Sequence, residues 1–113
     1  MEKFMYLFRR GDDLDLSPEA CQANDQKWGK WIHTLVQKDV FVNGEPLHHQ
    51  AEQVDRLEET LSHCPLSETK ETIVGYVVVN ARDIEEAIEI SRDCPVFETG
   101  GNIEVRQLRR LEI

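Results

Sequence analysis

The sequence predicts a small α+β domain of the ferredoxin-like type, in which two helices cover one face of a four-stranded antiparallel sheet. Three observations predict this fold. Aromatic and β-branched runs stand near the start, middle and end of the chain, two amphipathic segments separate them, and the resulting order is strand–helix–strand–strand–helix–strand. We expect the 113 residues to form one domain, 1–113, because a chain of this length supports a single hydrophobic core.

The first predicted strand is Lys3–Arg9, KFMYLFR, which is rich in aromatic and bulky aliphatic residues and too short for a helix. Side chains alternate along a strand, so Phe4, Tyr6 and Phe8 share one face and the intervening residues share the other. Both faces carry large apolar groups. We therefore expect this strand to be buried.

The first predicted helix begins at Ser17–Pro18, where Ser17 is a capping residue and proline suits the first helical position. It ends near Lys38. Gly29 weakens the helix by about 1 kcal/mol relative to alanine, and we expect close backbone packing there. Residues at spacings of three, four and seven form one apolar stripe: Cys21, Trp28, Trp31, Ile32, Leu35 and Val36.

A short second strand is predicted at Val40–Val42, before a turn at Asn43–Gly44. Residues 48–61 have helix-like spacing only in their second half, and we interpret them as an irregular arm that carries a short strand or a turn of helix. Thr72–Val79, TIVGYVVV, is the clearest strand in the chain, and because both of its faces are apolar we expect it to be central and covered.

The second helix is predicted to begin at Asp83, with Glu86 three residues later in a capping pattern. Cys94–Pro95 ends it, because proline cannot continue a helix. Asn102–Leu108 then alternates as a strand with one solvent-facing side. The narrow inward face of this helix consists of Ile84, Ala87, Ile88 and Ser91.

The other face of such a sheet has no helix to cover it, although the first and third predicted strands carry apolar residues there. A large exposed apolar patch is unusual on a soluble monomer. The sequence therefore predicts a homodimer formed through this face, since two-fold dimers are the commonest homo-oligomers.

The composition narrows the classes of partner. Asp and Glu number 22 against 13 Lys and Arg, a net charge of −9, which argues against nucleic-acid binding. Three widely spaced cysteines contain no CxxC pair, so we expect neither a zinc site nor a disulfide framework, and no metal or other cofactor is predicted. With no apolar run of about 20 residues and no signal-peptide pattern, we expect a cytoplasmic protein without membrane contact.

Several motifs in order resemble one known family. They are KFMYLFR, LSPE, KWGKWIHTL, VNGEPL, PLSETKE, VGYVVVNARDIEEAIEISRDCP and GGNIEVRQL. Together, from about Lys3 to Leu108, they resemble the YCII-related proteins that carry the DGPF domain. The resemblance implies a dimeric α/β barrel with a pocket between sheet and helix, near the dimer interface. It implies no settled activity, although distant members have been proposed to use a His–Asp pair.

The chain departs from the family at its defining motif. Where the family reads Asp-Gly-Pro-Phe, this sequence reads His63–Cys64–Pro65–Leu66. We interpret His63 as a candidate acid–base group, since an unperturbed histidine titrates near neutrality. The alternative is an ordinary loop residue. His63 and Cys64 are adjacent, which is a poor geometry for activating a thiolate.

The remaining candidates each have two interpretations. Glu45, in the GEPL stretch, either acts catalytically, or holds a turn or pairs with Lys70. Glu68 and Lys70 share a face of extended chain and either bind an anionic ligand or form a surface ion pair. The tryptophans either line a pocket or pack the core. The predicted ligand-contacting residues are Tyr6, Trp28, Trp31, Glu68 and Lys70, and the predicted catalytic residues are His63 and Glu45.

Two functions remain open from the sequence. The first is a homodimer that binds or transforms a small molecule, with histidine as acid–base. The second is a non-catalytic regulatory or structural dimer, favoured by the altered DGPF motif and by the lack of any complete catalytic constellation.

Overall fold

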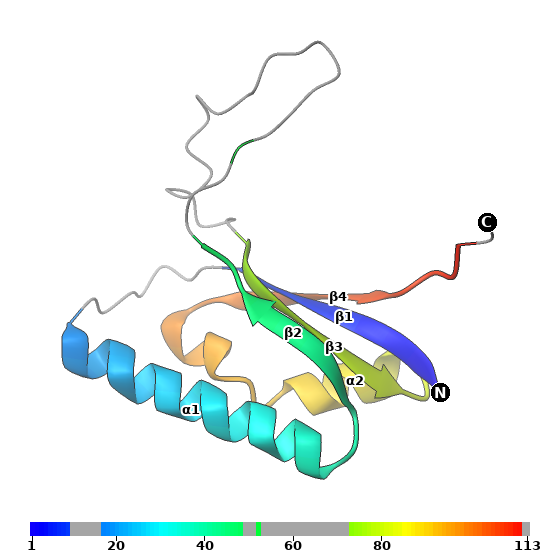
Figure 1. Ribbon diagram of the computed structural model, residues 1–113, viewed down its shortest axis with the longest axis horizontal. Coiled ribbons are helices and arrows are strands. Elements are labelled where there is room, and N and C mark those ends of the chain that lie inside the picture. Colours follow the sequence, from blue (N-terminus) through cyan, green and yellow to red (C-terminus); the bar gives the residue numbers. More distant parts are fainter. Residues whose placement is uncertain (10–16, 49–51, 53–72, 112–113) are drawn as a thin grey trace.

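A computed structural model describes residues 1–9, 17–48, 52 and 73–111. Its four strands form one antiparallel sheet in the order β2-β3-β1-β4, and both α-helices lie on the same side of it (Figure 1). This confirms the predicted ferredoxin-like α+β fold. The elements are β1 Glu2–Arg9, α1 Pro18–Gln37, β2 Phe41–Pro46, β3 Ile73–Ala81, α2 Ile84–Ser91, the 3₁₀ helix η2 Pro95–Thr99 and β4 Asn102–Gln107.

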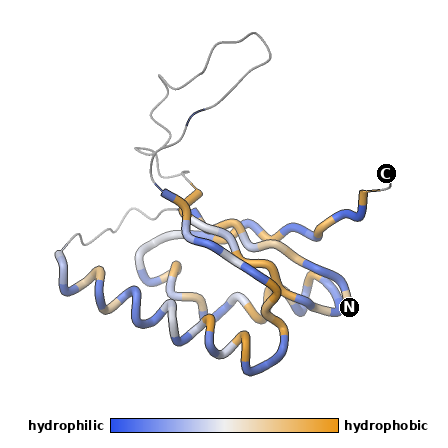
Figure 2. Tube along the Cα trace, in the orientation of Figure 1, coloured by the Kyte–Doolittle hydropathy of each residue, from blue (hydrophilic) through white to orange (hydrophobic). Residues whose placement is uncertain are grey.

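The core lies between the sheet and the helices. On β1, alternate residues Phe4, Tyr6 and Phe8 are almost fully buried, as the strand pattern predicted. Val77 and Val79 of β3 lie opposite them in register. Figure 2 shows hydrophobic segments along these central strands and a mostly hydrophilic α1. Each large apolar side chain buried here contributes about 1.5–3 kcal/mol.

Helix α1 begins and ends with specific hydrogen bonds. The Oγ of Ser17 accepts from the backbone N–H of Ala20 at 3.1 Å, which confirms the predicted cap. At the other end the N–H groups of Asp39 and Val40 donate to the carbonyls of Val36 and Leu35. This pairing is a Schellman motif, and Asp39 has the left-handed φ of 61° that the motif requires.

The apolar stripe of α1 is shorter than predicted. Trp31 and Leu35 are buried, and Trp28 and Ile32 pack partly against the core. The two ends of the predicted stripe, Cys21 and Val36, are exposed. Helical spacing alone could not show where the sheet stops supporting the helix.

The predicted turn at Asn43–Gly44 is wrong, because β2 runs through it to Pro46. The strand has a register shift between Phe41 and Asn43, and Gly44 pairs directly with Val77. A Cβ atom on Gly44 would lie 2.7 Å from the Tyr76 carbonyl oxygen. Gly44 therefore serves a close approach between two strands.

Helix α2 begins as predicted, with Asp83 Oδ1 accepting from the Glu86 N–H at 2.9 Å. Its inward face is narrower than predicted, because only Ala87 and Ser91 are buried. Ile84 and Ile88 are 42% and 39% exposed. After Cys94 the chain forms η2, an element that the Cys94–Pro95 stop signal did not predict.

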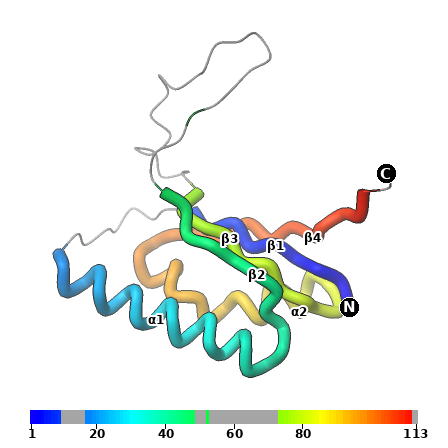
Figure 3. The backbone as a smooth tube through the Cα atoms, viewed as in Figure 1, coloured from blue at the N-terminus to red at the C-terminus, as the bar shows by residue number. Residues whose placement is uncertain are grey.

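The opposite face of the sheet is not covered by any helix in the described part of the chain (Figure 3). The register places Leu7 beside Tyr76 on β3 and beside Glu104 on β4. Glu104 accepts from Arg9 at 2.7 Å. We call this surface the open face; its apolar residues are Met5, Leu7, Val74, Tyr76 and Val78.

Candidate functional site

A cavity of about 470 Å³ lies between helix α1 and the edge of the sheet formed by β2 and β3. Its lining is mostly aromatic and aliphatic, with three glycines and two carboxylate residues. It is lined by Phe8, Asp25, Trp28, Gly29, Ile32, Phe41, Gly44, Glu45, Pro46, Val74, Gly75, Tyr76 and Val77.

One face of α1 forms the helical side of this cavity. Asp25, Trp28, Gly29 and Ile32 are three, four and seven residues apart, and this spacing places side chains on the same side of a helix. The Trp28 ring meets Phe8 edge to face, with centroids 4.9 Å apart and planes at 82°. This contact fixes the ring of Trp28 between the core and the cavity.

Gly29 faces empty space within this lining. Apart from its own helix backbone, a Cβ atom built on it would meet no heavy atom of the described residues within 4 Å, so the expectation of close backbone packing at Gly29 is wrong. The glycine still weakens the helix by about 1 kcal/mol relative to alanine. Its visible effect in the structure is to keep this part of the cavity open.

On the strand side of the cavity, Gly44 and Gly75 have close neighbours that leave little room for a side chain. A Cβ atom on Gly75 would lie 3.2 Å from the carbonyl oxygen of Glu45. Gly44 is more crowded still, and together the two glycines allow β2 and β3 to lie close together while adding no side chain to the lining of the cavity.

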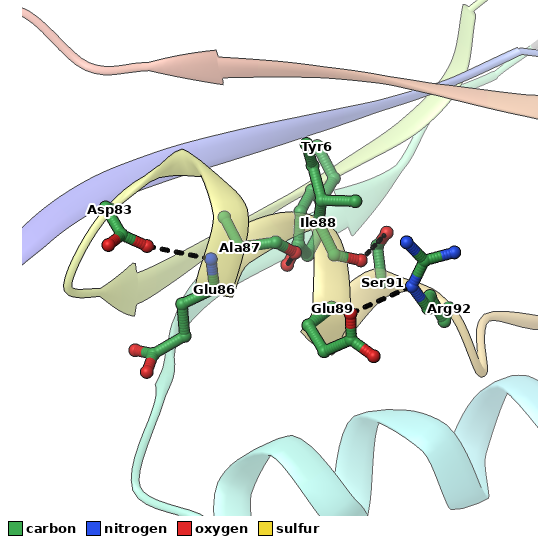
Figure 4. Close-up of polar contacts among 8 residues, drawn as sticks. All are labelled: Tyr6, Asp83, Glu86, Ala87, Ile88, Glu89, Ser91 and Arg92. Atoms are coloured by element: carbon green, nitrogen blue, oxygen red, sulfur yellow. Dashed lines mark hydrogen bonds and ion pairs between the residues drawn. The ribbon is translucent and has the colours of Figure 1, made fainter.

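Two of the predicted ligand-contacting residues lie in the core. Tyr6 is fully buried and its hydroxyl donates to the backbone carbonyl of Ala87 in α2 (Figure 4). Burial, with a smaller contribution from Cys94, raises the pKa of this phenol well above its ordinary value. Trp31 is 5% exposed and packs against Tyr6 and Phe8. Neither residue lines the cavity.

The other predicted residues have different positions. Trp28 lines the cavity as well as packing against the core. Glu45 also belongs to the lining. In the sheet it pairs with Tyr76, next to the Gly44–Val77 pair that lies on the face toward the helices. Since side chains alternate along a strand, its carboxylate points toward the open face. His63, Glu68 and Lys70 lie outside the described residues.

No metal centre or activated nucleophile is evident in the described ranges. They contain no group of three or more His, Cys, Asp or Glu placed to hold a metal ion. His33 and His48 are exposed. Cys94 is buried, and burial raises the pKa of its thiol to about 12, so that it stays protonated at neutral pH. Among the helices that are described, none is long and apolar enough to cross a bilayer.

Several residues of the cavity were missed from the sequence. Asp25 and Phe41 belong to its lining, and neither stood in a recognisable motif. The one usable signal was Gly29, a poor helix former inside a well-capped amphipathic helix.

The fold and the cavity together define a class: small ferredoxin-like α+β proteins with an aromatic cavity between a helix and the sheet. Within it, residues 3–112 match the YCII-related domain family, and the chain belongs to that family. This match agrees with the resemblance seen in the sequence motifs. No curated protein matches the sequence with significant similarity.

Proposed function

We propose that the protein is a homodimer that binds a small molecule in the cavity beside α1. The observation that carries this proposal is Gly29, which destabilises a helix and faces open space. A residue that costs stability without a packing reason is most simply explained by function. The cavity volume of about 470 Å³ lies in the range of small-molecule sites.

The open face supports the dimeric part of the proposal. Its centre is apolar, with Leu7 and Tyr76 adjacent in register, while Glu45 and Glu104 lie at either end of the same row. An apolar centre with a polar rim is the usual composition of a protein interface. A second copy covering this face would also lie beside β2 and β3, which line the cavity.

Binding is better supported than catalysis. Among the described residues that line the cavity, the titratable side chains are Asp25, Glu45 and Tyr76. The proposed acid–base groups are His63 and Glu45, and Lys70 with Glu68 are proposed ligand contacts. The alternative function, a non-catalytic regulatory dimer, is favoured by the absence of histidine from the described lining.

The binding proposal is tested by filling the space over Gly29. The Gly29→Leu variant is expected to lose the thermal shift produced by any small molecule that stabilises the wild-type protein in a broad screen. His33→Leu is the matched control, because it adds the same side chain to an exposed position of the same helix. A stabilising ligand that affects Gly29→Leu and wild type equally would reject the cavity as the site.

The catalytic and dimeric parts have separate tests. Replacing His63 or Glu45 by alanine is expected to leave ligand binding intact and to abolish turnover of a bound substrate, if the pair acts as acid and base.

Leu7→Glu, on the open face, is expected to convert the dimer to a monomer in light scattering. Ile88→Glu is its control, since Ile88 is 39% exposed on the helical side. A monomeric wild-type protein would reject the dimer.

A further inference from the structure

We infer that the ligand of the cavity is an amphiphilic cation, an amine with an aromatic or aliphatic body. The inference rests on the proposed small-molecule function and specifies its ligand class. The apolar body lies over Gly29 between Trp28 and the β2–β3 edge, and the ammonium group lies beside Asp25 at the mouth of the cavity.

The shape of the lining favours an apolar, flat body. Gly29 leaves open space on the helical side, while Gly44 and Gly75 add no side chain to the lining on the strand side. Trp28 is held edge to face against Phe8, so its ring orientation is set before a ligand enters. A flat apolar group can therefore contact the glycine surfaces and the indole without displacing a side chain.

The charge of the lining favours a cation. Asp25 is the charged side chain on the helical side, one helical turn before Gly29, and the described lining contains no lysine, arginine or histidine. Lys27, the nearest cation along α1, is paired with Glu98 of η2 at 3.1 Å. Among the described residues, Asp25 has no ion-pair partner of its own.

The position of Asp25 also explains why the ligand must be amphiphilic. Asp25 is exposed, so an ammonium group beside it keeps part of its hydration, and full burial of a charge is avoided. Trp28, three residues further along the same helix face, offers a cation–π contact to the same group. An anion would meet the Asp25 carboxylate and a net charge of −9, and both oppose its binding.

The test compares three ligands that share one phenylbutyl body: 4-phenylbutylamine, 4-phenylbutanol and 5-phenylpentanoate. Their binding is followed by the fluorescence of Trp28 and Trp31, the two tryptophans of the chain. The amine is expected to bind most tightly and the carboxylate most weakly. Raising the salt concentration is expected to weaken the binding of the amine and to leave the binding of the alcohol unchanged.

Three variants, one of them a control, identify the groups responsible for binding. Asp25→Asn is expected to lower the affinity for the amine about two- to fivefold, which is typical of an exposed ion pair, and to leave the affinity for the alcohol unchanged. Glu85→Gln is the control, because it removes one negative charge from an exposed position of α2; it is expected to change neither affinity. Gly29→Leu is expected to abolish binding of all three.

The outcomes separate the ligand class from the proposed function. If the alcohol or the carboxylate binds as tightly as the amine, and Gly29→Leu still abolishes binding, the cation is rejected and the cavity stands as a site. If Asp25→Asn leaves the affinity for the amine unchanged, Asp25 is rejected as its partner. If none of the three binds to the wild-type protein, both this inference and the cavity's proposed role as a site for such bodies fall.

Discussion

The two faces of the sheet are built from alternate residues of the same strands, yet they differ in how they are protected. On β1, Phe4 and Tyr6 face the helices and are 1% and 0% exposed, whereas their neighbours Met5 and Leu7 on the open face are only partly buried. The strand itself is the same on both sides. On this strand, the exposed fraction of a side chain therefore depends on whether the helical layer covers its face.

The largest expected contrast is between neighbours on β1. Phe4→Ala should lower the free energy of unfolding by about 3–5 kcal/mol, because it leaves a cavity in a packed core. Met5→Ala should cost about 1 kcal/mol or less in dilute solution, since its side chain is not enclosed. Urea unfolding of both variants at low protein concentration measures the difference, and equal losses would break the comparison.

The core between the sheet and the helices should also lose stability at alkaline pH. Burial raises the pKa of Cys94 from its ordinary 9.0 to about 12, so the folded state holds a proton that the unfolded state releases. The associated stability is complete below pH 9.0 and is lost as the pH rises toward 12. The slope for one such group is about 1.4 kcal/mol per pH unit.

This loss is measured by urea unfolding across the alkaline range. Cys94→Ala should flatten the slope, and Cys21→Ala, which removes an exposed thiol, should leave it unchanged. Tyr6, whose pKa is raised as well, adds to the loss at higher pH. Identical slopes in wild type and Cys94→Ala would show that this thiol does not titrate out of the core.

A smaller effect is expected from the hydroxyl group of Tyr6. Tyr6→Phe keeps the ring and removes the hydrogen bond to the Ala87 carbonyl. The loss should be about 1–2 kcal/mol, because a buried acceptor loses a partner. Chemical unfolding measures it, and a variant as stable as wild type would mean that the carbonyl finds another donor.

The smallest effect belongs to the open face. The hydrogen bond from Arg9 lowers the pKa of Glu104, so this contact stabilises the folded state above the ordinary value of 4.5 and is lost as the pH falls through the lowered value. Glu104→Gln should therefore lose slightly less stability than wild type on acidification. The test measures the unfolding midpoint of both proteins as the pH is lowered. Curves that stay parallel for wild type and Glu104→Gln would contradict the prediction.

The strands and the helix starts could be predicted because their signals are local. Alternation in KFMYLFR, the β-branched run of β3 and the caps at Ser17 and Asp83 each depend on a few neighbouring residues. The extent of α1's buried stripe could not be predicted in this way, because exposure of Val36 depends on where the sheet ends. The turn predicted at Asn43–Gly44 is wrong because glycine is equally suited to a turn and to a close approach between strands.

The candidate site was harder to predict than the fold. Of the three aromatic residues predicted to contact a ligand, Trp28 lies in the lining of the cavity, whereas Tyr6 and Trp31 lie in the core. Separating them requires the tilt of α1 over the sheet, which no local pattern encodes. A glycine inside an amphipathic helix is unusual, but the open space over Gly29 depends on how the helix packs on the sheet.

The two outermost strands of the described sheet have a consequence for self-association. β2 is interrupted by a register shift and ends in Pro46, which lacks an N–H group, while β4 carries Glu104 and Arg106. Both features discourage a further strand from adding at the rim of the sheet. Growth from edge to edge into filaments or aggregates is therefore disfavoured.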